Sequence, residues 1–273
     1  MADCSTVSTP MTPGLVLTKD VLEIVEHGRY LSAIGSLLYL SMQTRPDIAF
    51  AVAYLARFSA CPGEAHWKAV KHLFRYIRGT LDYRITYSKS APSSEPFLVY
   101  SDAAHGDCKE SGKSTSGYLV MAAGAPVSWR SKLQTIVALS TTEAEYVAGV
   151  NTGKELKWMR NLFTELGYGV PKASTLLMDN QSGIAVAKNP EHHGRMKQLD
   201  LAHYWLRDEV AKGYIQPEYI QTEFMLADIM TKPLTQSRVL FLKEEMGMRG
   251  SFEKVAKKVA FKMNETVLVP GEC

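Results

Sequence analysis

The sequence predicts an α/β fold, in which a mixed five-stranded sheet flanked by helices follows a small helical segment. Apolar residues recur at spacings of three and four between residues 30 and 80, which is the period of a helix. After residue 97 the pattern becomes three strands, helix, strand, helix, strand and helix, which is typical of an α/β domain. The composition, with 46% hydrophobic and 22% charged residues, is that of a folded globular protein.

The first part of the chain divides into a lead-in and a helical segment. Residues 1–27 contain Pro10, Pro13 and Gly14 without clear periodicity, so we expect a loose lead-in. Residues 28–88 form the helical segment, in which Cys61-Pro62-Gly63 predicts a turn. We expect helices over residues 30–40, 47–59 and 64–78.

The stretch 88–96, rich in Ser and Pro, predicts a domain boundary. The α/β domain then covers residues 97–235, and residues 236–273 form a C-terminal helix and tail. Short apolar runs bounded by turn residues predict strands over 97–101, 117–123, 126–131, 174–178 and 215–220. Longer periodic runs predict helices over 141–166, 180–188, 199–212 and 223–231.

Composition limits the class of protein. No apolar run reaches the roughly 20 residues of a membrane span, and the N-terminus lacks a basic region before an apolar stretch. The four cysteines form no CxxC pair, so neither a zinc site nor a disulfide framework is indicated. We therefore expect an intracellular, cytoplasmic protein, and the net charge of +3 neither requires nor excludes a nucleic-acid partner.

Carboxylates mark the predicted strand ends. Asp102 follows the apolar run FLVYS and Asp179 follows TLLM, at the sheet edge where α/β proteins collect their ligands. The helix over 141–166 adds Glu143 and Glu145, of which only one can face the sheet because they are two residues apart. The last short helix adds Asp228.

Such a group of acids, without clustered Cys or His, suits Mg²⁺ or Mn²⁺ better than Zn²⁺. Its natural chemistry is two-metal hydrolysis of a phosphodiester. An acid at a strand end is also a common turn or helix cap, which is the plainer interpretation of each residue taken alone.

Longer motifs surround these acids. The segments are YSDAAHGDCKESGKSTSGYLV, PVSWRSKLQTIVALSTTEAEYVAG, LLMDNQSGIAVAKNP, HHGRMKQLDLAHYWLRDEV and QTEFMLADIMTKPL. Together they resemble the ribonuclease H region of copia-type (Ty1/copia) LTR retrotransposon Pol polyproteins. Upstream, YLSAIGSLLYLSMQTRPDIAFAVAYLARFSACPGEAHWKAVKHLFRYIRGT resembles the segment that joins the reverse transcriptase to that ribonuclease H. The resemblance covers about residues 10–248 and implies a ribonuclease H-like fold after a reverse transcriptase connection.

The resemblance also implies a site. Four acids would hold two Mg²⁺ ions, with Mn²⁺ as a substitute: Asp102 in YSDA, Glu145 in AEYVA, Asp179 in MDNQS and Asp228 in LADIMTKP. Glu143 would then face outward. The implied reaction is cleavage of the RNA strand of an RNA–DNA hybrid.

The chain departs from the family pattern at two places. Related elements have Trp after SDA and His in a KHID stretch, whereas this chain has Ala104-His105 and Gln198. Neither position is a metal ligand in the family pattern, so the departures bear on substrate contacts or packing. The loop histidine of cellular ribonucleases H has no counterpart between Tyr219 and Asp228.

Four residues are candidates for contact with nucleic acid. Lys71 and Arg75 lie on the basic face of the helix over 64–78, which could follow a hybrid backbone or simply be solvated. Asn180 and Gln181 follow a metal-site aspartate; they could reach the minor groove, where RNA 2′-hydroxyls lie, or act as local caps.

Two functions stay open at this point. The first is a Mg²⁺-dependent ribonuclease H-type endonuclease acting on RNA–DNA hybrids, with the polymerase domain of a parent reverse transcriptase as a second partner. The alternative is a truncated or co-opted remnant that folds and binds nucleic acid without cutting it. No Tyr-x-Asp-Asp polymerase motif occurs in the sequence, so polymerase activity is not expected.

Overall fold

The computed structural model describes residues 4–19, 25–88, 96–188 and 201–250. Its centre is a five-stranded mixed sheet with the strand order β4-β3-β2-β5-β6. β2, β3 and β4 are antiparallel neighbours, whereas β5 and β6 run parallel to β2. The strands are β2 (Leu98–Ala104), β3 (Thr115–Ala122), β4 (Ala125–Leu133), β5 (Ser174–Met178) and β6 (Ile215–Tyr219). The predicted α/β class with a mixed, ribonuclease H-like sheet is confirmed.

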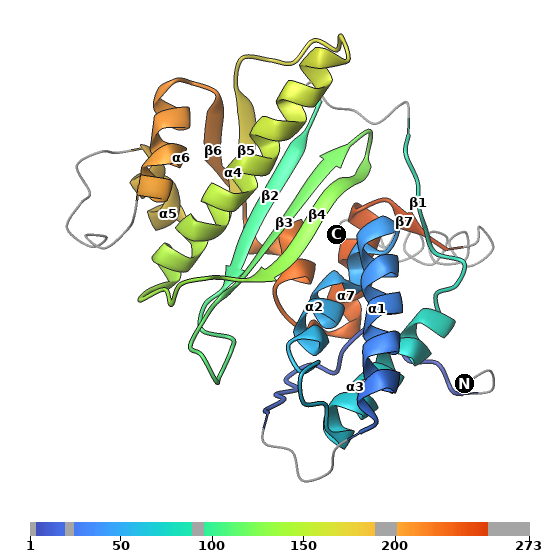
Figure 1. Ribbon diagram of the computed structural model, residues 1–273. Coiled ribbons are helices and arrows are strands. Elements are labelled where there is room, and N and C mark those ends of the chain that lie inside the picture. The colour runs from blue at the N-terminus through green and yellow to red at the C-terminus, as the bar shows by residue number, and fades with distance from the viewer. Residues whose placement is uncertain (1–3, 20–24, 89–95, 189–200, 251–273) are drawn as a thin grey trace, which may run out of the picture.

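Both faces of the sheet are covered (Figure 1). On one face, α4 (Thr141–Glu165), α5 (Gln181–Lys188) and α6 (Leu201–Ala211) pack against side chains such as Val99. On the other face, the 3₁₀ helix η4 (Leu226–Met230) and α7 (Gln236–Glu245) pack against side chains such as Tyr100. Successive residues of a strand point to opposite faces, so the apolar run of β2 serves both cores.

The helical segment lies beside the sheet (Figure 1). It consists of α1 (His27–Gln43), η1 (Pro46–Ile48), α2 (Ala49–Ala56) and α3 (Glu64–Arg78) around its own buried cluster. The remaining elements are η3 (Thr222–Phe224) and a two-stranded antiparallel ladder of β1 (Arg84–Ile85) and β7 (Met248–Arg249). None of the helices in these described segments is long and apolar enough to cross a membrane.

Three predicted elements differ from the structure. The helix expected over 47–59 begins as the 3₁₀ turn η1 at Pro46 and continues as α2 only to Ala56. The helix expected over 223–231 is two short 3₁₀ helices. The lead-in is not loose where it is described, because Leu17 is buried in the helical core and its N–H donates to the Tyr54 hydroxyl at 3.1 Å.

Contacts tie the helical segment to the sheet across the predicted boundary. Arg57, the C-cap residue of α2, donates to Thr115 Oγ1 at 2.7 Å and forms an ion pair with Asp107 at 3.4 Å. The Trp129 indole N–H of β4 donates to the Ser41 carbonyl at 2.8 Å. In addition, α2 and η1 contact η4, which carries Asp228. Residues 89–95 of the boundary, residues 251–273 of the tail and Gln198 lie outside the described residues.

Candidate active site

The register of two parallel strands places Asp102 beside Asp179. The last paired residues of β2 and β5 are Ser101 and Met178, so the two aspartates are the next residues along each chain. β2 continues to Ala104, which corrects the predicted strand end at residue 101: Asp102 lies within a strand. β5 ends at Met178, so Asp179 is the first residue beyond the carboxyl end of its strand.

The start of α4 decides which glutamate reaches the sheet. Ser140 is the N-cap, and its Oγ accepts a hydrogen bond from the Glu143 N–H at 3.1 Å. The Glu143 carboxylate in turn accepts from the Leu139 N–H at 2.8 Å, so this residue caps the helix. Glu145, two residues further on, is buried, and its Oε1 accepts from the Ala103 N–H of β2 at 3.2 Å.

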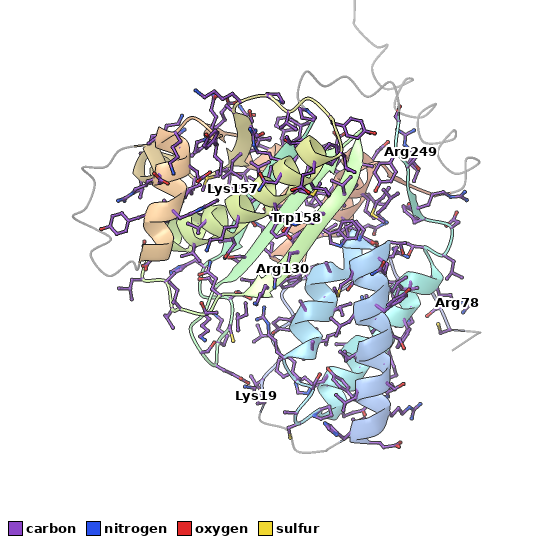
Figure 2. The ribbon with its side chains drawn as sticks, turned by 45° about the horizontal axis from the view of Figure 1, so that its top comes forward. Lys19, Arg78, Arg130, Lys157, Trp158 and Arg249 are labelled. Atoms are coloured by element: carbon purple, nitrogen blue, oxygen red, sulfur yellow. The ribbon has the colours of Figure 1, made fainter. Side chains whose placement is uncertain are left out.

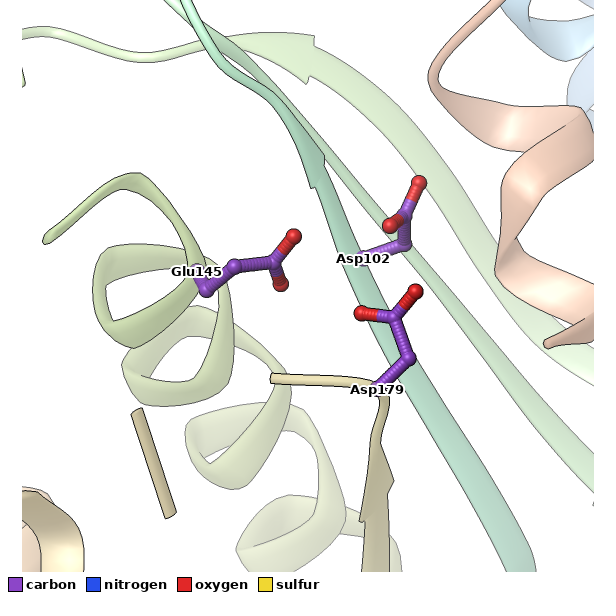
Figure 3. Close-up of side chains that lie close together, drawn as sticks. All are labelled: Asp102, Glu145 and Asp179. Carbon is purple, nitrogen blue, oxygen red and sulfur yellow. The ribbon is translucent and has the colours of Figure 1, made fainter. Parts of the chain in front are cut away.

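Three of the four predicted acids come together (Figure 3). One carboxylate oxygen from each of Asp102, Glu145 and Asp179 lies within 4.8 Å of the other two. Asp102 is 2% exposed and Glu145 3% exposed, so solvent screens their repulsion weakly. Among the described residues, Glu145 Oε2 has no hydrogen-bond partner although it is buried.

Burial and mutual repulsion disfavour the charged forms of these groups. Burial, with added repulsion from Asp102 and Asp179, raises the pKa of Glu145 to about 9. Burial also raises the pKa of Asp102 to about 6, an effect that the nearby Lys232 ammonium only partly offsets. A divalent cation would remove both penalties. The oxygen donors and the unpartnered Glu145 oxygen therefore fit a hard ion such as Mg²⁺ or Mn²⁺.

Asp228 lies outside this group of three. Its Oδ1 is 2.6 Å from Lys232 Nζ and its Oδ2 is 2.9 Å from Arg238 Nη2. The same Lys232 Nζ is 3.8 Å from Asp102 Oδ2, so the lysine connects Asp228 to the other acids. Neither cation was expected from the sequence, although Lys232 stands inside the LADIMTKP motif.

Gly117 makes room for the segment that carries Asp228. It pairs with Asp102 across the β2–β3 ladder. A Cβ at this position would lie 2.5 Å from Met230 Cβ and 2.7 Å from Thr231 Cγ2. The missing side chain lets residues 230–231 approach the sheet, where the Thr231 hydroxyl donates to the Asp102 carboxylate.

The four nucleic-acid candidates are placed by local contacts. Asn180 Oδ1 accepts from the Gly183 N–H at 2.9 Å, which is a cap of α5, and Gln181 is exposed at the first position of that helix. On α3, Lys71 Nζ is 3.4 Å from the Glu64 carboxylate. Arg75 donates to the carbonyl and the hydroxyl of Ser5, both at 2.7 Å. Within the described part of the chain, none of these hydrogen bonds or ion pairs reaches the group of three acids.

Comparisons with known proteins find retrotransposon Pol polyproteins among the relatives of this chain. The chain is 39% identical over 259 residues to the Retrovirus-related Pol polyprotein from transposon TNT 1-94 of Nicotiana tabacum, covering 92% of this chain and 19% of that protein. It is 36% identical over 238 residues to the corresponding polyprotein from transposon RE1 of Arabidopsis thaliana, covering 87% and 16%. The chain thus spans less than a fifth of the length of these relatives.

Two further comparisons add little to these relatives. No family model matches the chain. Among solved structures, the N-terminal RNASE H domain of rv2228c from Mycobacterium tuberculosis aligns with 55% of this chain and 98% of that domain's chain. The identity is 14% and the TM-score 0.34, so the fold assignment rests on the strand order described above.

Proposed function

Because the chain belongs to the family of copia-type retrotransposon Pol polyproteins, we propose that it is a ribonuclease H-type endonuclease that cleaves the RNA strand of RNA–DNA hybrids. The observation that carries this proposal is the convergence of Asp102, Glu145 and Asp179 from three separate elements. Two of these carboxylates, Asp102 and Glu145, are buried, and ionised groups this close together repel one another, so a bound cation would stabilise the arrangement.

We assign the ligands from this arrangement. Asp102, Glu145 and Asp179 would hold one Mg²⁺ ion, and Asp102 with Asp228 would hold a second. When bound, such a pair of ions supplies an activated water and stabilises the leaving 3′ oxygen of a phosphodiester.

The chain's own groups orient the ligands. The Ala103 N–H fixes one oxygen of Glu145, and the Thr231 hydroxyl fixes one oxygen of Asp102. Hydrogen bonds of this kind hold carboxylates in one direction and so improve their fit to an ion. The other Glu145 oxygen is left for a ligand.

A cleavage assay with the full chain tests the proposal. A labelled RNA–DNA hybrid in Mg²⁺ buffer is expected to yield cut RNA, while the DNA strand stays intact. Asp102→Asn and Asp179→Asn are each expected to reduce the rate by at least about 100-fold, because each removes a charged ligand. Asp208→Asn is the control, since Asp208 is a half-exposed aspartate that pairs with Lys212 on the surface.

The outcomes separate the two functions considered from the sequence. Loss of cleavage in both site variants, with Asp208→Asn unaffected, supports the nuclease. Hybrid binding without Mg²⁺-dependent product in the unchanged chain would instead identify a remnant that binds nucleic acid only. The reverse transcriptase polymerase domain of a parent polyprotein is the further partner that we propose, because the relatives are Pol polyproteins.

A further inference from the structure

A lysine lies at the place where a second cation is expected. Lys232 Nζ is 2.6 Å from Asp228 Oδ1 and 3.8 Å from Asp102 Oδ2. Both carboxylates are nearly inaccessible, with side chains 5% and 2% exposed. One ammonium group thus faces two buried acids, in the position that the proposed function gives to a divalent ion.

The charges of the site favour one divalent ion while the lysine is present. The acids Asp102, Glu145, Asp179 and Asp228 carry four negative charges when ionised, and two cations, Lys232 and Arg238, face them. The two negative charges that remain are neutralised by a single divalent ion. A second ion beside Asp102 and Asp228 would meet an ammonium group at short range and be repelled by it.

The geometry separates the two positions. Asp102 uses Oδ2 toward Thr231 and Lys232, while the group of three acids gathers on the side of Glu145 and Asp179. Lys232 contacts no member of that group other than Asp102 among the described residues. The first ion can therefore bind without moving the lysine.

We propose that Lys232 is the resident cation of the second metal position, so that the free protein binds one divalent ion and a second ion must displace the lysine. The inference rests on the proposed function, which defines both metal positions. It makes the loading of the site ordered: the three-acid position fills first, and the Asp102–Asp228 position opens when Lys232 leaves.

Binding of Mn²⁺ to the full chain without nucleic acid tests this directly. Electron paramagnetic resonance of free Mn²⁺ counts bound ions without relying on activity. The unchanged chain is expected to bind one ion. Lys232→Met, which keeps most of the side-chain volume without the charge, is expected to bind a second ion at least about tenfold more tightly than the unchanged chain does.

Two variants serve as controls. Lys232→Arg keeps the charge and is expected to bind one ion. Lys157→Met removes an ammonium group of α4 that is 2.7 Å from the buried Glu209 carboxylate of α6. This variant should still bind one Mn²⁺ ion. Figure 2 shows Lys157 on α4, which makes it a lysine paired with a buried acid at another site.

The inference is overturned if the unchanged chain binds two Mn²⁺ ions with similar affinity, or if Lys232→Met leaves the second ion as weak as before. Should Lys232→Met fail to fold, Asp228→Asn decides: the first ion should bind as tightly as in the unchanged chain, and loss of that ion contradicts separate positions. If the unchanged chain and Glu145→Gln both bind no ion, there is no metal site, and the proposed function fails together with the inference. If the unchanged chain binds two ions equally well, only the inference about Lys232 fails.

Discussion

Glu145 combines three properties at the scale of a single residue. It is buried, one of its oxygens accepts from Ala103, and the other has no hydrogen-bond partner in the described part of the chain. A group in that state destabilises the fold as long as it is charged and unpartnered. The ligand role proposed for Glu145 would supply the missing partner and stabilise its charged form.

The first prediction concerns the stability of Glu145→Gln. The raised pKa keeps Glu145 protonated in the metal-free fold at neutral pH, whereas the unfolded chain is stabilised by ionising it. An amide of the same shape ionises in neither state, so at neutral pH the variant without metal is expected to melt about 2–4 °C higher than the unchanged chain, corresponding to about 1 kcal/mol. Added Mg²⁺ should raise the melting temperature of the unchanged chain but not of the variant. Thermal melting with and without Mg²⁺ measures both effects, and equal Mg²⁺ shifts in the two proteins would refute the ligand role.

The second prediction is a pH dependence. The folded-state pKa values of Glu145, about 9, and Asp102, about 6, lie above their ordinary values of 4.5 and 3.8. The contribution of these protonated groups to the free energy of unfolding is fully present below their ordinary pKa values. It is lost as the pH rises through the folded-state pKa values. The metal-free protein is therefore expected to lose stability between about pH 4.5 and 9.

Mg²⁺ should follow the opposite trend, because its binding releases protons from these groups. Its apparent affinity is expected to rise between about pH 6 and pH 9. Mg²⁺ titrations followed by thermal melting at three pH values in this range provide the measurement. An affinity that is constant or falls with pH would show that the two carboxyl groups are not the ligands.

The acidic residues of the candidate site could be predicted from the sequence. The resemblance pointed to Asp102, Glu145, Asp179 and Asp228, and the structure gathers the first three of them. The cap formed by Ser140 and Glu143 explains why Glu145 is the glutamate that reaches the sheet. The ion pairs of Asp228 could not be predicted, because they depend on how residues 226–238 fold back on the sheet.

At the scale of elements, the close approach of β3 and η4 positions the site. Gly117 of β3 faces Met230 and Thr231 at a distance that leaves no room for a side chain. The packing of these residues keeps the Thr231 hydroxyl on Asp102.

The third prediction tests this contact. Gly117→Ala is expected to destabilise the protein by about 1–3 kcal/mol, since its Cβ would overlap Met230 Cβ and Thr231 Cγ2. It should also slow cleavage, because Asp102 loses a fixed hydrogen bond. Gly35→Ala is the matched control: Gly35 lies in α1 with nothing within 4 Å of an added Cβ, and alanine there should stabilise the helix by about 0.5–1 kcal/mol. Denaturant unfolding that gives the two variants the same stability would contradict the role of Gly117.

Elements were predicted well where the period was strong and poorly where the backbone is irregular. All five strands of the large sheet and the long helix over 141–165 lie where the apolar pattern indicates them. The expected helices over 47–59 and 223–231 failed for different reasons. The helix expected over 47–59 begins instead with the 3₁₀ turn at Pro46. The backbone over 223–231 is set by the packing of η4 against Gly117, and such a contact cannot be predicted from a sequence pattern.

At the scale of the whole molecule, the helical segment supports the sheet. Arg57 and Trp129 bridge the two parts, and Ala49 of α2 belongs to the same buried cluster as Leu119 and Ile229. Figure 2 shows Arg78 on α3 of the helical segment and Trp158 on α4. The Ser- and Pro-rich stretch 88–96 suggested a boundary, but a linker composition cannot reveal contacts made across it.

The fourth prediction is that both parts unfold together. Because they share a buried cluster, the full chain is expected to show one thermal transition whose calorimetric and van't Hoff enthalpies agree. Differential scanning calorimetry provides this comparison. Two separate transitions would mean that the helical segment is an independent unit.

The central claim is that Asp102, Glu145 and Asp179 form a metal-dependent nuclease site. Its most direct test is the rate of RNA cleavage in an RNA–DNA hybrid by the unchanged chain and by Asp179→Asn, at matched folded fractions and at several Mg²⁺ concentrations. We predict cleavage that requires Mg²⁺ in the unchanged chain and falls by at least about 100-fold in the variant. Equal rates in the two proteins, or cleavage that persists after Mg²⁺ is chelated, would contradict the claim.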